Sequence, residues 1–234
     1  MWLYGASGHG KVIQDILDAG GRHVDGFVDD NPEFEELAGL PVVHSTEDVD
    51  EMIVSIGENE TRKKIARKLD CKVAEAAVHP SAVVAATARL EEGTVVMAAA
   101  VVNAEARIGR HCIINTGASI DHECLVGDFV HISPHATLCG NVTVGEGTWV
   151  GAGTTIIQGV KIGRWCMIGA GSVVTHDIPD GWLAMGNRCR LIKQINQDML
   201  KSQTKMGGGK WLISSSLYLE YCQSSRRRGY SYAA

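Results

Sequence analysis

Between residues 114 and 135, the stretch INTGASIDHECLVGDFVHISPH gathers side chains that are capable of acid–base chemistry. They are Asn115, Asp121, His122, Glu123, His131 and His135. A reaction in which a nucleophile loses a proton as it attacks needs a base, and an imidazole has a suitable pKa. His122 stands between two carboxylates and is the candidate base. A lone surface histidine is otherwise most often only solvated.

A six-residue repeat runs through this stretch and decides the architecture. Aliphatic residues recur at every sixth position from Val84 to Val174 without a gap. The residue four positions later is in most cases small or β-branched, as at Cys112, Cys124 and Cys166. Neither the helix period nor the two-residue strand period fits this spacing. The repeat predicts a parallel β-helix of short strands and corners, with these three cysteines as inert core residues.

Residues 1–78 follow a different pattern, which predicts a separate Rossmann-like domain. We expect strands at residues 2–4, 23–28 and 52–56 and a helix over residues 12–19. A second helix is expected to be capped by Asn59 and to end at Leu69. Strand, glycine turn, helix and strand in this order form a βαβ unit.

The turn between the first strand and helix suits a phosphate group. It consists of Gly5, Ala6, Ser7, Gly8, His9 and Gly10. Its N–H groups lie at a helix N-terminus, where anions bind, and Asp29 and Asp30 end the next strand, where carboxylates accept hydrogen bonds from a ribose or base. Val12 stands where a Walker loop needs a hydroxyl, and the glycine spacing is not a dinucleotide fingerprint. The turn predicts a nucleoside diphosphate site, with a purely structural turn as the alternative.

The glycine turn, the aspartate pair and the repeat together resemble the sialic acid O-acetyltransferase and UDP-4-amino-sugar N-acetyltransferase family, a group of hexapeptide-repeat sugar acyltransferases. Its aliphatic–glycine pairs occur here, for example at Ile108-Gly109, Val126-Gly127 and Ile162-Gly163. The resemblance covers residues 2 to about 192. It implies that the α/β domain of residues 1–78 binds a nucleotide sugar and that it precedes a left-handed β-helix with three hexapeptides per coil. It also implies a homotrimer, with acetyl-CoA as the acetyl donor.

The resemblance also implies roles for individual residues. The family's catalytic stretch matches Asn115-Thr116 and His122-Glu123-Cys124. This match implies that His122 is the general base and that Glu123 orients it or raises its basicity. Asn115 and His131 match further active-site positions, with His131 near the thioester end of the cofactor.

With three hexapeptides per coil, residues eighteen apart stack in adjacent coils. Gly140 then lies beside His122, where a missing side chain leaves space for a substrate and a backbone N–H is placed to stabilise an oxyanion. Pro134, Ala152 and Ala170 form a smooth strip for the pantetheine arm of CoA between subunits. Tight trimer packing explains the same small residues equally well.

The expected reaction is N-acetylation of a UDP-linked 4-amino-4,6-dideoxy sugar in bacterial glycan biosynthesis. O-acetylation of a sialic acid and N-acetylation of GDP-perosamine are the enzymatic alternatives. A zinc enzyme of the carbonic anhydrase type, with His131 and His135 as ligands, and a non-catalytic module that binds a nucleotide sugar are more distant ones. We expect no metal.

Composition and charge restrict the class of partner. The net charge is −5 and the pI is about 6.0, which argues against nucleic-acid binding. No apolar stretch is long enough for a membrane span, and seven cysteines without a regular spacing argue against a disulfide framework. We expect a cytoplasmic protein with small-molecule substrates.

The repeat is expected to end near residue 186, so that the β-helix domain covers residues 79–186. Gly186-Asn187-Arg188-Cys189 stands where related CoA enzymes have a turn of the GNPA type. Residues 187–204 are expected to form a turn and a helix that caps the open end of the β-helix, because apolar residues follow Leu191 at helical spacing. Residues 205–234 are a tail to which the sequence assigns no role.

Overall fold

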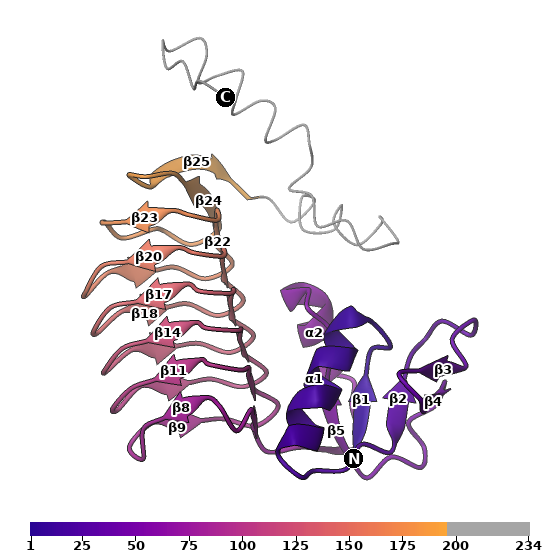
Figure 1. The fold of residues 1–234 in the computed structure, drawn as a ribbon. Helices are drawn as coiled ribbons and strands as arrows, with labels where there is room; N and C mark the ends of the chain where they lie inside the picture. The colour runs from indigo at the N-terminus through magenta and orange to yellow at the C-terminus, as the bar shows by residue number, and fades with distance from the viewer. Residues whose placement is uncertain (196–234) are drawn as a thin grey trace, which may run out of the picture. The chain divides into compact units, whose positions relative to one another are not determined.

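The computed structural model describes residues 1–195, in which an α/β domain precedes a parallel β-helix (Figure 1). The predicted fold class is confirmed. Within residues 1–195, no helix has the length and apolar character that crossing a membrane requires.

A six-stranded sheet with the order β3-β4-β2-β1-β5-β6 forms the N-terminal domain. Its strands are β1 (Trp2–Tyr4), β2 (Gly26–Val28), β3 (Glu36–Leu37), β4 (Leu40–Val43), β5 (Glu51–Val54) and β6 (Lys72–Val73). Pairing is parallel except between β3 and β4. The helices are α1 (Gly8–Ala19) and α2 (Asn59–Ala66). The βαβ order is as predicted, but α1 begins inside the glycine turn.

The predicted cap of α2 is wrong. The capping residue is Glu58, whose carboxylate accepts hydrogen bonds from the backbone N–H groups of Glu60 (2.9 Å) and Thr61 (2.6 Å). Asn59 is already helical, and its amide donates to carbonyl groups of the β-helix instead. The helix ends at Ala66, before the expected Leu69.

Three sheets form the faces of the β-helix. The first face contains β7 (Ala77–Val78), β10 (Val95–Val96), β13 (Ile113–Ile114), β16 (His131–Ile132), β19 (Trp149–Val150), β22 (Met167–Ile168), β24 (Trp182–Met185) and β25 (Arg190–Gln194). The second face contains β8 (Val83–Val84), β11 (Val101–Val102), β14 (Ser119–Ile120), β17 (Thr137–Leu138), β20 (Thr155–Ile156) and β23 (Val173–Val174). The third face contains β9 (Arg89–Leu90), β12 (Arg107–Ile108), β15 (Leu125–Val126), β18 (Thr143–Val144) and β21 (Lys161–Ile162).

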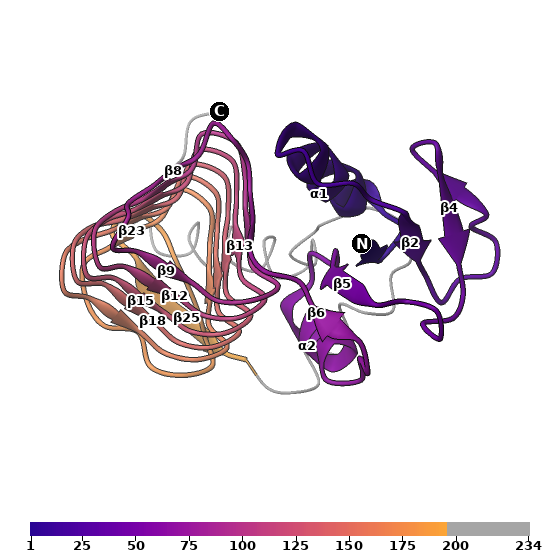
Figure 2. The same cartoon turned by 90° about the horizontal axis from the view of Figure 1, so that it is seen from below.

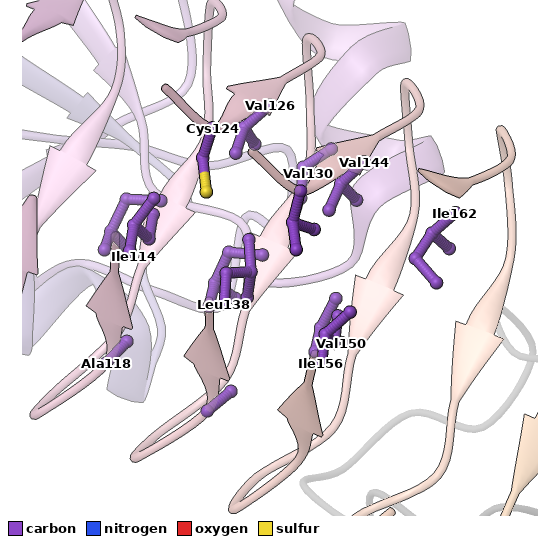
Figure 3. Packing of buried hydrophobic residues seen from close by; sticks show 14 of the residues in the cluster. Ile114, Ala118, Cys124, Val126, Val130, Leu138, Val144, Val150, Ile156 and Ile162 are labelled. Carbon is purple, nitrogen blue, oxygen red and sulfur yellow. The ribbon is translucent and has the colours of Figure 1, made fainter. Parts of the chain in front are cut away.

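The register confirms the predicted stacking. Ile113 pairs with His131 and His131 with Trp149, so that residues eighteen apart are neighbours in adjacent coils. The second residue of each strand points inward, and these aliphatic side chains fill a narrow core (Figure 3). Cys112, Cys124 and Cys166 are buried in the same core, and burial raises the pKa of the Cys112 thiol to about 12. The predicted core position of the three cysteines is confirmed.

The N-terminal domain covers the outer side of the first face at the coils of β7, β10 and β13 (Figures 1 and 2). Val95 and Ile113, which point outward from β10 and β13, are buried in one apolar cluster with Leu3, Ile13 and Ile16 of the N-terminal domain. Burial of this apolar surface stabilises the contact between the domains. His131 is the next outward residue on this face, one coil further along.

The expected C-terminal helix is wrong where the structure describes it. Residues 190–194 form β25, which pairs antiparallel with β24. The last coil leaves a row of unpaired backbone groups at its edge, and pairing with a further strand satisfies them where a helix would not. The remainder of the expected helix and the tail 205–234 lie outside the described residues.

Candidate active site

The predicted base, His122, lies at the corner between β14 and β15, where its ring is 57% exposed. Its Nδ1 is 3.2 Å from Oε2 of Glu123, and its backbone N–H donates to Oδ1 of Asp121 (2.7 Å). The same Asp121 oxygen accepts a hydrogen bond from Nδ2 of Asn103 (3.1 Å), and the two bonds lower the pKa of Asp121. Asn103 was missed, although it lies eighteen residues before Asp121 and the stacking rule could have found it.

Gly140 lies directly against His122, as predicted, but the space beside it is not vacant. A Cβ atom on Gly140 would lie 2.6 Å from both Cε1 and Nε2 of His122, so the ring itself occupies the place of the missing side chain. The glycine therefore makes room for the imidazole and not for a substrate. The Gly140 N–H donates to no acceptor within residues 1–195, and the residue is buried beneath the ring.

Asn115 and His131 form a second cluster. Nδ2 of Asn115 is 3.0 Å from Nε2 of His131, and Oδ1 of Asn115 accepts from the Thr116 N–H (2.8 Å). This bond fixes the amide so that Nδ2 donates to His131, whose proton must then be on Nδ1. His131 is 7% exposed and packs on Trp149, with 4.4 Å between ring centroids. Burial, helped by the charge of Arg62, holds the pKa of His131 well below its usual value.

The two clusters lie at different edges of the β-helix. His122 and Glu123 are between β14 and β15, at the edge shared by the second and third faces. Asn115 is between β13 and β14, at the edge shared by the first and second faces, and His131 is in β16 of the first face. One chain therefore does not bring His122 together with Asn115 and His131.

The small-residue strip runs along the same edge as Asn115. The Gly153 N–H donates to the Pro134 carbonyl (2.9 Å) and the Gly171 N–H to the Ala152 carbonyl (2.8 Å), which shows the stacking of successive corners. Ala152 and Ala170 are exposed. The strip therefore offers a smooth and accessible surface along this edge.

The glycine turn is shaped by close backbone contacts. Gly5 has a φ of +115°, and a Cβ atom on it would lie 2.9 Å from Cγ1 of Ile56. A Cβ atom on Gly10 would lie 2.7 Å from the Gly5 carbonyl oxygen, whereas Gly8 has open space around it. The Ser7 side chain makes no capping hydrogen bond to α1. The N-terminus of α1 is thus uncapped and is suited to an anion.

The aspartate pair is used within the domain. Asp29 accepts hydrogen bonds from the N–H groups of Ala6 (2.8 Å) and Asn31 (2.9 Å), one at each carboxylate oxygen. Asp30 accepts from the hydroxyl of Tyr4 (2.6 Å), and burial together with this carboxylate raises the pKa of Tyr4. Asp29 therefore holds the glycine turn, while Asp30 is exposed at its rim. Tyr4 was missed by sequence reasoning.

Within residues 1–195, no three His, Cys, Asp or Glu side chains come close enough together to hold a metal ion. His131 and His135 make different contacts. The His135 ring is stacked over Gly117 at the exposed corner, while Nε2 of His131 is bonded to Asn115 on the first face.

Comparison with known proteins gives a consistent picture. The PglD N-terminal domain family matches residues 1–69, and the bacterial transferase hexapeptide (six repeats) family matches residues 141–176. The structure of PerB from Caulobacter crescentus in complex with CoA and GDP-perosamine is 38% identical, with a TM-score of 0.78, and the match covers 82% of this chain and 96% of that one. The acetyltransferase domain of PglB from Neisseria gonorrhoeae in complex with acetyl coenzyme A is 35% identical, with a TM-score of 0.78, over 82% and 98% of the two chains.

WeeI from Acinetobacter baumannii shares the fold at 24% identity, with a TM-score of 0.72 over 82% of this chain and 98% of that one. The identity to PerB and PglB, together with the two family matches, confirms the resemblance seen in the sequence. The chain belongs to the hexapeptide-repeat sugar acyltransferases that carry a PglD-type N-terminal domain.

Proposed function

We propose that the protein transfers the acetyl group of acetyl-CoA to the 4-amino group of a sugar linked to a nucleoside diphosphate, with His122 as the general base. The position of the His122 ring carries the proposal, because its packing on Gly140 and its contact with Glu123 hold a basic nitrogen at an exposed corner. The relatives PerB and PglB, bound to CoA and acetyl coenzyme A, support the donor.

The residues at this corner can perform the proton transfer. Glu123 at Nδ1 favours the tautomer with the proton on Nδ1, which leaves the Nε2 lone pair free. Acetyl-CoA supplies a thioester whose carbonyl the sugar amine attacks. His122 accepts the amine proton at Nε2 as the new C–N bond forms, and the Gly140 N–H donates to the carbonyl oxygen as it becomes negative. The tetrahedral intermediate then collapses with cleavage of the C–S bond, and CoA leaves as the free thiol after its sulfur takes the proton from His122.

The complete site requires two copies of the chain. His122 lies at one edge of the second face and Asn115 with the strip at the other. The outward residues of the second face are uncharged: Val83, Val101, Ser119, Thr137, Thr155 and Val173. The third face carries Arg89, Arg107 and Lys161 outward. If three second faces meet around a threefold axis, the His122 edge of each chain joins the Asn115 edge of the next.

In this arrangement, the pantetheine arm of CoA lies along Pro134, Ala152 and Ala170, and its thioester reaches Asn115. His131 is neutral and accepts a hydrogen bond from Asn115, so it orients the amide and is not itself a base. The second hydrogen on Nδ2 of Asn115 is then free to contact the acetyl carbonyl or the sugar.

The glycine turn at residues 5–10 and Asp30 are proposed to hold the nucleotide. UDP is the first candidate. The match to PerB, whose structure contains GDP-perosamine, favours GDP-perosamine as the second.

The test is an assay of thiol release from acetyl-CoA with a panel of UDP- and GDP-linked 4-amino sugars and sialic acid. We expect turnover with one amino sugar nucleotide and a loss of at least about a hundredfold in kcat for His122→Ala. His176→Ala, which changes an exposed histidine near the end of the β-helix, is the matched control. A near wild-type rate for His122→Ala removes this residue from the mechanism, and ligand binding without any thiol release favours a non-catalytic module.

A further inference from the structure

Arg62 is a buried cation whose hydrogen bonds join the two domains. It is 1% exposed, and all five of its N–H groups have acceptors. Its guanidinium donates to the carbonyls of Ile56 (2.9 Å), Gly57 (2.9 Å), His111 (2.8 Å) and Phe129 (3.0 Å) and to Oδ1 of Asn59 (2.8 Å). Three of these acceptors are in the N-terminal domain and two are in the β-helix. One side chain thus fixes both.

Two other side chains of α2 also contact the corner of the β-helix between the third and first faces, beside which α2 lies (Figure 2). Nδ2 of Asn59 donates to the carbonyls of Gly147 (3.1 Å) and Thr148 (3.3 Å), one coil beyond Phe129. Lys63 forms an ion pair with Glu146, and its Nζ lies 4.9 Å from the centroid of the Trp165 ring. The helix is therefore fixed to successive coils and cannot slide by one coil without breaking these bonds.

The surroundings of Arg62 are unusual for a contact that serves only stability. Burial lowers its pKa to about 10, so it stays charged at neutral pH, yet no carboxylate within residues 1–195 pairs with it. His9, His111 and His131 are nearby and neutral, because burial and the Arg62 charge lower each pKa. A buried charge without an ionic partner is costly, and apolar residues usually stabilise such a place at least as well. The planar guanidinium presents its five donors in a rigid arrangement, so it specifies one relative geometry of the two domains.

The same guanidinium reaches the rim of the glycine turn. The carbonyls that it holds belong to Ile56 and Gly57, which follow Ser55 at the end of β5, and Ile56 packs against Gly5. On the other side, Arg62 holds the carbonyls at the corner beside the first face, which carries His131. Arg62 therefore links the segment beside the glycine turn to the corner of that face.

We propose that Arg62 is a positioning residue that sets where the nucleotide-bound sugar meets the acetyl donor. The proposal rests on the proposed function. It predicts that a change at Arg62 affects the rate of transfer more than the binding of the nucleotide, because the glycine turn itself stays intact. A residue that only stabilises the fold would lower the melting temperature and leave kcat unchanged below it.

The test compares wild type with Arg62→Lys, which keeps the charge but not the fork, and with Asn59→Ala, which removes fewer bonds. Arg67→Lys on the exposed end of α2 is the matched control. Thermal unfolding, binding of UDP and GDP, steady-state kinetics and amide exchange at residues 109–112 and 127–130 are measured on the full chain. We expect Arg62→Lys to keep nucleotide affinity within about threefold, to lose about tenfold or more in kcat, and to exchange faster at both segments.

An unchanged kcat in folded Arg62→Lys overturns the inference, as does a loss confined to nucleotide affinity. If Arg62→Lys does not fold, the same comparison on Asn59→Ala decides. If wild type transfers no acetyl group to any sugar nucleotide, the proposed function fails. Amide exchange then still tests whether Arg62 holds the two domains together. Unchanged exchange at residues 109–112 and 127–130 in folded Arg62→Lys would show that it does not.

Discussion

Replacing Gly140 by alanine tests the catalytic corner without removing any polar group. The new Cβ would lie 2.6 Å from Cε1 and Nε2 of His122, against about 3.5–4 Å for ordinary carbon contacts, so the ring must move by about 1 Å. The ring is more than half exposed and can turn aside, and a side chain held about 30° away from its rotamer costs about 0.5–1.5 kcal/mol. We therefore expect the free energy of unfolding to fall by no more than about 1.5 kcal/mol.

The catalytic effect should be much larger. A misplacement of about 1 Å costs roughly a hundredfold in rate, which corresponds to about 2.7 kcal/mol and remains within the range for a general base. Because alanine keeps the backbone N–H, the loss reports on the His122 ring alone. The assay is steady-state thiol release, with Gln158→Ala, one coil further along the same column, as the control.

A double-mutant cycle makes the test stricter. If Gly140→Ala acts by displacing His122, it should cost nothing further in a His122→Ala background. A full rate for the single variant would refute the reasoning. So would a hundredfold loss that persists after His122 has been removed, because the effect would then come from another group.

Three further outcomes are expected. Ala152→Phe should raise KM for acetyl-CoA severalfold and leave nucleotide affinity unchanged, because Ala152 is exposed and a large ring there would obstruct the proposed path of the pantetheine arm. An unchanged KM would contradict binding of CoA along this strip. Asp29→Ala should weaken UDP or GDP binding by about tenfold, measured by calorimetry, because the turn loses the bond to the Ala6 N–H; unaltered binding excludes this role. The free energy of unfolding should decrease as pH drops from 6.5 to about 4. Folding lowers the pKa of His9 and of His111 from 6.5 to about 4, so in this range the unfolded chain binds protons that the folded chain does not, which costs up to roughly 3 kcal/mol for each histidine. A urea midpoint that stays constant across this pH range would contradict this expectation.

The repeat could be read from the sequence because each coil contacts only its neighbours and the period of the chain is the period of the structure. The same arithmetic also separates the two clusters. Asn115 and His122 belong to successive hexapeptides, so they must lie at successive corners, although they are close in sequence.

The junction between the domains could not be predicted in this way. Arg62 binds carbonyl groups of His111 and Phe129, which are far along the chain and whose side chains carry no signal of the contact. The cap of α2 was missed for the same reason, because Asn59 is drawn into that junction. Residues 190–194 have apolar residues at helical spacing, but they form a strand because the edge of the last coil offers unpaired backbone groups for hydrogen bonding.

The eighteen-residue register restricts how this protein can change its length during evolution. Insertion of a single hexapeptide after Gly140 would rotate every later corner by one edge and would move Ala152 away from the edge that carries Asn115. Insertion of a complete coil would preserve every column and lengthen the track for the pantetheine arm by about 4.8 Å. Viable length variants of the solenoid should therefore differ by complete coils, or by loops that bulge outward from the corners.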